Sequence, residues 1–439
     1  MIDGEPKIKV ALLQNSPEAR LRLEGSFFLP NGRAVAGELI AATAGGQILL
    51  TDLNGGEIAR ENEIMISPAP STENFFTVRN VKIGIDFHWQ RLQEQSFRGA
   101  LLISPGGPAL NLINIISLEE YLASVISSEM AAEAPLEFLK AQAITARSWL
   151  VAMLAKKQAP RAAQTRRDPE ITVWQDVNDH QGFDVCADDH CQRYQGITRI
   201  ISKSVREAID ATRGVFLTSE GQICDARYYK CCGGRTDVFA TAWEDASFPY
   251  LSSITDHDRE YAPINTEEAA AAWLRSSPAA YCNTTDQDIL GRILPAFDLE
   301  TLNFYRWRVS YSREELEETM KAKSGIDFGT LSNLEPLARG PSGRIYRLKI
   351  EGTRRTVIVG KELEIRRWLS PTHLLSSAFV VSLLREANGA VSRVTLEGGG
   401  WGHGVGLCQI GAAVMAVRGH KAENILAHYF TGALLRKLY

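Results

Sequence analysis

The chain has 439 residues, of which 45% are hydrophobic and 23% are charged, an ordinary balance for a globular protein. A count of 48 Lys and Arg against 52 Asp and Glu gives a net charge of -4, which argues against a general nucleic-acid binder. The length predicts two or three domains, or one large domain with insertions. No apolar run is long enough to predict a transmembrane helix.

The N-terminal part of the chain is predicted to be rich in β-strands. Short apolar runs separated by Gly, Pro and Asn are typical of strands. Such runs occur at residues 7–13, 21–29, 46–53, 81–89, 99–105 and 110–116. Because no spacing of residues here suggests catalysis, we interpret residues 1–80 as a β-rich scaffold region.

Residues 117–150 are predicted to form two helices, with Glu129 at their junction. Ser117 and Glu120 have the spacing of a capping box at the start of the first helix. Pro135 suits the first position of the second helix. Glu129 falls on the apolar stripe of the first helix. Partial burial there would raise the pKa of its carboxyl group, as a general acid needs near neutral pH.

Residues 157–200 lose the apolar rhythm and are predicted to form a long polar loop. The loop, at about residues 160–200, contains four candidate metal ligands, which are His180, Cys186, His190 and Cys191. Thiolates and imidazoles suit tetrahedral zinc, and four of them would close a structural site. A loop with so little core of its own could be folded by a metal ion.

These candidates also have ordinary structural alternatives. Glu129 could cap its helix or form an ion pair with Arg147, without any catalytic role. Cys186 and Cys191 could form a disulfide or remain free thiols. Since the chain has seven cysteines, an odd number, they cannot all pair within one chain.

A helix is predicted to end at Gly214, and strands are predicted to follow it. The next cluster is rich in aromatic, Cys and Gly residues: Tyr228, Tyr229, Cys231, Cys232, Gly233 and Gly234. Paired glycines indicate a tight turn or a close approach of the backbone to another group. Gly233 and Gly234 are therefore candidate substrate-binding positions, and the adjacent cysteines leave a redox role open.

Residues 260–335 have a mainly helical pattern and are interpreted as a possible inserted lobe. The runs 345–352 and 354–360 alternate like a hairpin around Gly352, and a short helix is predicted over 361–369.

The last part of the chain has seven glycines within residues 398–411, with His403 among them. Helices are predicted over 409–417 and 422–429. Exposed main-chain amides and a helix N-terminus favour a polar or anionic group. The loop is not a phosphate loop, because no Gly-Lys-Ser/Thr follows. We therefore take His403 as a candidate catalytic residue, and Gly404 and Gln409 as candidate substrate-binding residues.

Three stretches, in this order, resemble the SpoIID/LytB family of stage II sporulation protein D and amidase-enhancer proteins. They are SLEEYLASVISSEM with LKAQAITARSW, ARYYKCCGGRTD with PYLSSITD, and GGGWGHGVGLCQIGAAVMAVRGHKAENILAHYF. The likeness runs from about residue 80 to the C-terminus, and its last stretch is the most specific. We therefore expect an α+β protein whose residues 81–439 form a SpoIID-like core of mixed helices and strands.

The resemblance implies that the protein binds or cuts peptidoglycan. Sporulation members of the family are lytic transglycosylases that act on glycan strands without stem peptides. The family's catalytic glutamate matches Glu129, its downstream arginine matches Arg147, its tyrosine before the double glycine matches Tyr228, and its loop histidine matches His403. Family members can also carry zinc on mixed His and Cys ligands. The resemblance thus implies a structural Zn²⁺ on the four ligands of the polar loop.

Two departures from the family pattern fall near the predicted site. Lys230, Cys231 and Cys232 replace a serine-rich run, and Cys408 stands where Ser or Thr is frequent. The alternatives to a transglycosylase are a non-catalytic glycan-binding amidase enhancer, a zinc hydrolase and a purely structural envelope protein. The expected partners are glycan strands and a cell-wall amidase, with no nucleic acid.

The predicted location follows from the substrate. The first residues lack the basic stretch and apolar core of a signal peptide, which taken literally predicts the cytoplasm. Peptidoglycan lies outside the cytoplasm, however. We therefore predict a cell-envelope location, on the expectation that the sequence is a trimmed form of the natural chain.

Overall fold

The structure is a computed structural model, and its described residues fall into ten segments. They are 4–70, 73–84, 91–131, 133–156, 165–174, 180–188, 190–199, 202–295, 298–300 and 302–439. Within these segments the chain forms nine α-helices and twenty-four strands. The predicted α+β class is therefore confirmed. None of the helices in these segments is both long and apolar enough to cross a membrane.

The chain divides into two compact units. The first unit comprises Met1–Glu133, Val177–Val215 and Lys437–Tyr439, and the second comprises Ala134–Asp176 and Phe216–Arg436. The sequence-based boundary near residue 80, the polar loop near 160–200 and the inserted lobe near 260–335 remain predictions.

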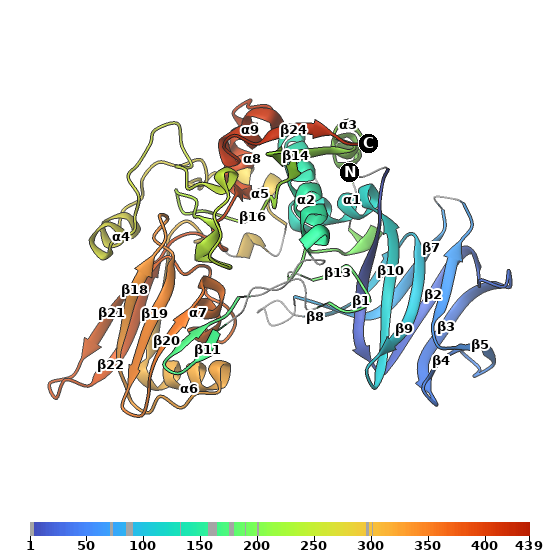
Figure 1. Cartoon of the computed structure of the whole chain (residues 1–439), viewed down its shortest axis with the longest axis horizontal. Helices are drawn as coiled ribbons and strands as arrows, with labels where there is room; N and C mark the ends of the chain where they lie inside the picture. The colour runs from blue at the N-terminus through green and yellow to red at the C-terminus, as the bar shows by residue number, and fades with distance from the viewer. Residues whose placement is uncertain are drawn as a thin grey trace. The chain divides into compact units, whose positions relative to one another are not determined.

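An eleven-stranded sheet, counted over the described residues, forms the body of the first unit. Its order is β13-β1-β10-β9-β6-β2-β3-β4-β5, and β7 pairs with both β2 and β8. Figure 1 shows most of these strands in blue and cyan. Their bounds are Lys7–Ser16 (β1), Glu18–Phe28 (β2), Ala34–Ala44 (β3), Gln47–Asp52 (β4), Glu57–Glu61 (β5), Ile64–Pro68 (β6), Phe75–Ile83 (β7), Arg91–Phe97 (β8), Ala100–Gly106 (β9), Ala109–Ser117 (β10) and Val185–Cys186 (β13).

The predicted strands are confirmed for the runs 7–13, 21–29, 46–53, 99–105 and 110–116, each of which falls on one strand of this sheet. Of the run 81–89, only residues 81–83 lie on a described strand, at the end of β7. In β2, Ala19, Leu21 and Leu23 are buried while the residues between them are exposed, which is the period of a half-buried strand. The run 81–89 continues past Gly84 into residues outside the described ones.

Helices α1 (Leu118–Glu129) and α3 (Lys203–Ala211) pack together in the first unit. Helix α1 begins after Ser117 as predicted, but the predicted capping box is wrong, since the Ser117 side chain makes no capping bond. Glu120 instead pairs with Arg206 of α3, whose Nη2 donates to Glu120 Oε2 at 2.8 Å. A two-pronged Arg–carboxylate pair is stronger than a single bond to a backbone N–H.

The second unit contains four smaller sheets within the described residues. Their orders are β11-β12-β20-β19-β18, β17-β22-β21, β15-β14-β24 and β16-β23. The bounds are Thr165–Arg167 (β11), Glu170–Thr172 (β12), Val215–Ser219 (β14), Gln222–Ile223 (β15), Tyr228–Tyr229 (β16), Trp307–Ser312 (β17), Leu331–Arg339 (β18), Ile345–Gly352 (β19), Thr356–Gly360 (β20), Phe379–Arg385 (β21), Val391–Gly398 (β22), Leu407–Cys408 (β23) and Leu434–Lys437 (β24).

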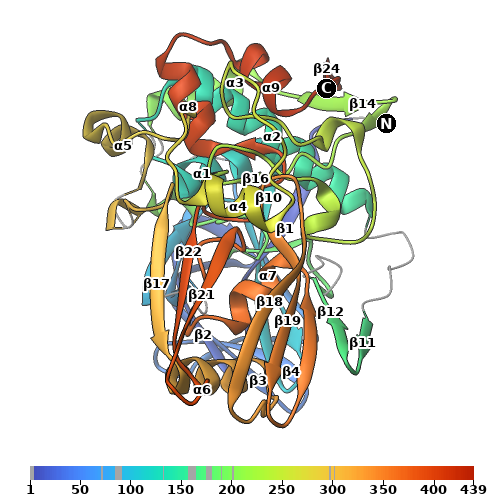
Figure 2. The same cartoon turned by 90° about the vertical axis from the view of Figure 1, so that its left-hand side faces the viewer.

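The helices of the second unit complete its architecture. They are Leu136–Lys156 (α2), Glu267–Leu274 (α4), Gln287–Ile293 (α5), Arg313–Ser324 (α6), Glu362–Trp368 (α7), Gln409–Val417 (α8) and Ala422–Tyr429 (α9). Helix α2 packs against α8 and α9, and α6 packs across β17 and β22 at one end of their sheet (Figure 2). A large apolar core joins α6 and α7 to the strands around them.

Most of the predicted elements of this unit are confirmed. Strands β19 and β20 form the expected antiparallel hairpin, and α7, α8 and α9 occupy the predicted stretches. The stretch 260–335 is less helical than predicted, because besides α4, α5 and α6 it contains β17, the start of β18 and long irregular segments. The helix predicted to reach Gly214 is shorter, because α3 ends at Ala211 and Thr212 caps it.

Candidate functional site

Glu129 is the last residue of α1 and is half-buried. The helix stops there because Met130 is extended, although its N–H still bonds to Ile126 O at 3.2 Å. The Glu129 Oε1 atom accepts a hydrogen bond of 3.0 Å from the backbone N–H of Arg193. A side chain in this position is fixed at one oxygen and keeps an exposed fraction, which a proton donor to a substrate needs.

The segment that supplies this N–H is tied to the sheet and to α1. Tyr121 of α1 donates from its hydroxyl to Gln192 Oε1 at 3.1 Å. Tyr194 donates from its hydroxyl to Asn114 Oδ1 at 2.6 Å, and its ring stacks on Tyr121 with centroids 5.1 Å apart. Arg193 lies between these two anchors, so its backbone N–H has a fixed position next to α1.

The four predicted metal ligands of the polar loop lie together in the first unit. The ligand atoms of His180, Cys186, His190 and Cys191 are all within 4.8 Å of one another. His180 Nε2 lies 3.1 Å from Cys191 Sγ, and His190 Nδ1 lies 3.5 Å from the same sulfur. Bonding from Cys191, followed by His180 and His190, lowers the pKa of Cys186 to about 2 against the opposing effect of burial.

This donor set fits a zinc ion. Zinc takes four N and S ligands at about 2.0–2.3 Å in a tetrahedron, which requires donor atoms a few ångströms apart, as here. The set is also held by the fold, since β13 pairs with β1 through Ala11 and Cys186. These two residues pack with Phe183 in a small apolar cluster. The four residues could therefore hold the expected ion in a closed, structural site.

Arg147 lies on α2 in the second unit and is fully buried. A guanidinium group keeps its charge inside a protein, so its burial requires a negative or polar group nearby. Gln142 lies on the same helix and is also fully buried. Among the described residues, neither atom of its side-chain amide has a hydrogen-bond partner. Gln142 is not among the residues predicted from the sequence, although a polar residue inside an Ala-rich helical pattern is a signal that could have identified it.

Tyr228 and His403 meet in the second unit, where β16 pairs with β23. His403 Nε2 lies 3.0 Å from the backbone oxygen of Tyr228, and His403 Nδ1 accepts the N–H of Val405 at 3.1 Å. Because Nδ1 accepts, Nε2 carries the proton and donates it to the carbonyl oxygen. Both ring nitrogens are thus bonded to backbone groups, which gives His403 the geometry of a residue that positions Tyr228.

The surroundings of His403 keep its ring neutral. Burial is the main cause of a pKa well below the ordinary value, and the charges of Arg227 and Arg344 lower it further. The Trp243 ring packs edge-on against the imidazole with centroids 4.8 Å apart. Arg227 lies over the same Trp243 ring at 4.1 Å.

We expect the free energy of unfolding of the His403→Gln variant to fall less at acidic pH than that of the wild type. The unfolded chain protonates this histidine below about pH 6.5, while the folded chain does not until a much lower pH. Wild-type stability should therefore fall as pH drops below about 6.5, by up to about 1.4 kcal/mol per pH unit from this group, and show no such term above about pH 7.5. Thermal unfolding of wild type and variant, below about pH 6.5 and above about pH 7.5, measures this difference in stability. A slope in His403→Gln equal to that of the wild type would contradict the assignment.

Gly404 has a structural reason to be glycine. Its φ of 85° lies in the left-handed region, and a Cβ there would come within 2.6 Å of the Arg344 guanidinium. Its carbonyl oxygen accepts the N–H of Asp237 at 2.6 Å. Arg344 is fully buried and donates to the carbonyl oxygens of Gly402 and Cys232 at 3.0 and 3.2 Å. The glycine-rich loop is therefore held by a buried cation.

Replacing Gly404 by Ala is expected to destabilise the fold by about 2–4 kcal/mol, because backbone strain and a clash with Arg344 add together. Gly389→Ala is the matched control: its φ is 84°, but nothing lies within 4 Å of the added Cβ. Gly389→Ala should lower the free energy of unfolding only through backbone strain, by about 1–2 kcal/mol. Denaturant unfolding measures the free energy of unfolding of both variants. Equal losses of stability would show that the clash with Arg344 does not contribute.

Gly233 and Gly234 form the predicted close approach. Both have positive φ, and a Cβ on Gly234 would meet the Trp273 ring at 2.7 Å. The carbonyl oxygen of Gly233 accepts from Trp273 Nε1 at 3.1 Å. Gln409, the first residue of α8, is 1% exposed, and its Nε2 has no hydrogen-bond partner among the described residues.

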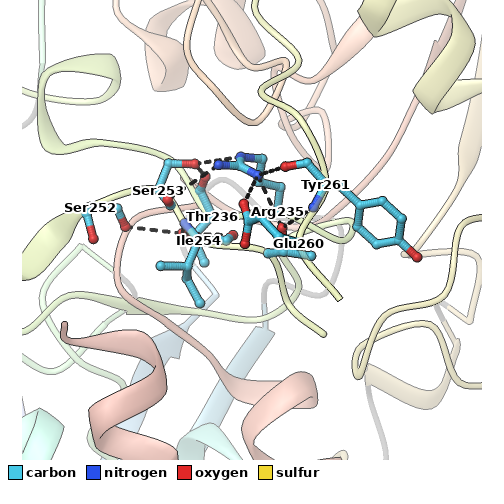
Figure 3. Close-up of polar contacts among 8 residues, drawn as sticks. Arg235, Thr236, Ser252, Ser253, Ile254, Glu260 and Tyr261 are labelled. Atoms are coloured by element: carbon cyan, nitrogen blue, oxygen red, sulfur yellow. Dashed lines mark hydrogen bonds and ion pairs between the residues drawn. The ribbon is translucent and has the colours of Figure 1, made fainter. Parts of the chain in front are cut away.

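Arg235 follows the two glycines and ties them to a second loop (Figure 3). Its guanidinium donates to Glu260 Oε1 at 2.8 Å and to Ser253 Oγ at 3.0 Å, and it also bonds to the carbonyl oxygen of Tyr261. Thr236 N–H donates to the carbonyl oxygen of Ile254 at 2.9 Å. The glycine turn is therefore a fixed part of the second unit.

The comparisons with known proteins agree with the sequence pattern. Residues 107–219 match the family model "Stage II sporulation protein", a range that contains Glu129, Arg147 and the four metal-ligand candidates. Residues 237–406 match a "Domain of unknown function (DUF8618)", a range that contains His403 and Gly404.

Whole-chain relatives extend this similarity. "Stage II sporulation protein D" of Bacillus amyloliquefaciens is 25% identical over 72% of this chain and 73% of its own length. The protein of the same name from Bacillus subtilis (strain 168) is 26% identical over 72% and 74%. "Amidase enhancer" of Bacillus subtilis (strain 168) is 23% identical over 72% of this chain and 40% of its own length. The resemblance described above is thereby confirmed.

Proposed function

We propose that this chain binds peptidoglycan and cleaves its glycan strands as a lytic transglycosylase, since residues 107–219 match the stage II sporulation protein family model. The observation that carries the proposal is the setting of Glu129. It is a half-buried carboxyl group at the end of a helix, and a rigid backbone N–H from Arg193 holds one of its oxygens.

The proposed reaction uses one carboxyl group twice. Protonated Glu129 donates its proton to the glycosidic oxygen between N-acetylmuramic acid and N-acetylglucosamine, and the C1–O bond breaks. The resulting carboxylate then takes the proton from the muramic C6 hydroxyl, whose oxygen bonds to C1 and closes an anhydro ring. No water is consumed, whereas ordinary glycosidases need a second carboxylate to act as nucleophile or to activate water.

The Arg193 N–H suits the second half of this cycle. A hydrogen bond donated to a carboxylate oxygen stabilises the ionised form, and that form is the base which accepts the C6 proton. The proposed zinc ion would have an indirect role. It would keep the polar loop folded and thereby hold Arg193 in place. Its four protein ligands would leave no open position, which argues against the alternative of a zinc hydrolase.

The other predicted residues receive roles that fit their settings. We assign Arg147 to contact the substrate or an acidic neighbour and Tyr228 to contact the substrate. His403 positions Tyr228 through its carbonyl oxygen. Gly233 and Gly234 shape the turn at the substrate, and Gly404 shapes the glycine-rich loop. Gln409 offers a buried amide N–H group for a substrate carbonyl oxygen.

A second function is favoured by the similarity to the amidase enhancer. In that case the chain would bind glycan without cutting it and would stimulate a cell-wall amidase. Both functions place the protein in the cell envelope with glycan strands as its ligand.

Purified glycan strands separate the two functions. The full chain is incubated with strands that lack stem peptides, and the products are analysed by mass spectrometry. A transglycosylase produces anhydro-muramic ends without any amidase. An enhancer leaves these strands intact, and instead raises the rate at which an added amidase releases peptides from intact peptidoglycan.

A further inference from the structure

A second group of potential metal ligands lies in the second unit, separate from the polar loop. One ligand atom from each of Cys232, Asp256, Cys282 and Cys408 lies within 4.8 Å of the others. All four side chains are at most 2% exposed. The sulfur atoms of Cys232 and Cys282 are 3.4 Å apart. Three thiols and a carboxyl group from four distant parts of the sequence therefore converge on one buried point.

The backbone N–H groups of three of these residues donate hydrogen bonds that hold the cluster together. The N–H of Asp256 donates to the carbonyl oxygen of Gly234 at 3.1 Å. The N–H of Cys282 donates to Asp256 Oδ2 at 2.8 Å. On the other side, the N–H of Cys232 donates to Cys408 Sγ at 3.2 Å. Two of these bonds join the backbone of one ligand residue to the side chain of another, so the four ligands are positioned together.

The donor atoms of this cluster suit a divalent cation. Backbone N–H groups point at two of the sulfurs, since Gly234 also donates to Cys232 Sγ at 3.3 Å. Such bonds stabilise thiolates at metal centres. Asp256 is fully buried and bonds to Tyr429, and none of the ion pairs among the described residues includes it. A buried carboxylate without a counter-charge is costly, and a bound divalent ion removes that cost.

We propose that Cys232, Cys282, Cys408 and Asp256 bind a structural divalent metal ion of the zinc type. Zinc takes thiolate sulfur at about 2.3 Å and carboxylate oxygen at about 2.0–2.2 Å, usually four ligands in a tetrahedron. Two sulfurs of one such tetrahedron lie about 3.8 Å apart by that geometry, close to the 3.4 Å observed. With four protein ligands the site is closed, so the ion holds structure and activates no water.

The position of this site indicates which elements a bound ion would stabilise. Cys408 ends β23, which pairs with β16 beside Tyr228, and it also precedes the first residue of α8. An ion here would join β23, the turn after β16 and the loops that carry Asp256 and Cys282. Two departures from the family pattern, at Cys232 and Cys408, meet at this one site. The metal site rests on contacts within the second unit and does not depend on the proposed glycan cleavage.

The test is a count of bound zinc in the purified full chain. We expect two zinc ions per chain in the wild type, one on each ligand group. Cys282→Ser should lose one ion, and Cys191→Ser should lose the other. Cys224→Ser is the matched control, because Cys224 is a buried thiol of the same unit outside the cluster, and it should keep both ions.

X-ray absorption on Cys191→Ser tests the site with its own ligands intact, so it does not depend on the folding of Cys282→Ser. The expected zinc shell has three sulfurs and one oxygen. The proposal would be overturned by a Cys191→Ser protein without zinc. It would equally be overturned by a non-reducing peptide map that links Cys232 to Cys282 in the wild type.

Discussion

Glu129→Gln is expected to lower the rate of glycan cleavage by roughly 10²–10⁴-fold, the usual contribution of a general acid or base. The amide cannot donate the proton that the leaving sugar needs, nor accept the C6 proton afterwards. It can still accept the Arg193 N–H through its oxygen, so the fold should be retained. The measurement is the initial rate of release of anhydro-muramic products, with circular dichroism to confirm folding.

Glu133→Gln is the matched control for this experiment. Glu133 lies four residues beyond Glu129 in the described link after α1, and it is exposed. Its variant should cleave glycan at the wild-type rate. Equal rates for wild type and Glu129→Gln would remove Glu129 from the mechanism, whatever the products are.

Loss of the proposed metal ion from the polar loop is expected to have the second-largest effect on glycan cleavage. Cys191→Ser removes one ligand, and Arg193, which holds Glu129, lies only two residues further along. We expect glycan cleavage to fall by roughly 10–100-fold, as when groups that support a metal site are changed. The thermal midpoint of the first unit should fall as well, because the energy of zinc binding contributes directly to folding.

Chelation and metal return give a check on this result. Zinc should restore cleavage and stability to chelated wild type, and Mg²⁺ should not, because it prefers oxygen ligands. Cys224→Ser serves again as the control cysteine and should behave as wild type. Full cleavage by a Cys191→Ser protein that has lost the ion of the polar loop would show that the loop does not position Glu129.

Local sequence signals predicted much of the fold. Helices α2, α8 and α9 and the hairpin β19–β20 follow from periodicity and from Pro and Gly at their ends. The capping box failed because Arg206, far along the sequence, provides a stronger partner for Glu120 than the local backbone does. Short-range rules cannot include such a partner.

The residue types of the candidate site could be predicted from the sequence, but the contacts of these residues could not. The four ligands of the polar loop are recognisable by their chemistry, and the structure brings them together. The partners of Glu129 and His403 are backbone groups of Arg193, Tyr228 and Val405, which any residue type could supply. Sequence alone gives no signal for a backbone partner.

The cysteine cluster of the second unit was also hidden. Cys232 and Cys408 stood out as departures from the family pattern, but Asp256 and Cys282 carried no signal in the sequence. Only the pairing of their loops with the glycine turn brings the four ligands together.

Cleavage in water labelled with heavy oxygen tests the central claim most directly, because the proposed ring closure uses the sugar's own C6 oxygen. The account predicts that the new muramic ends made by the wild type carry no label and have the mass of an anhydro sugar. Labelled, hydrolysed ends would contradict it, since they would show that water and not the C6 hydroxyl attacks C1.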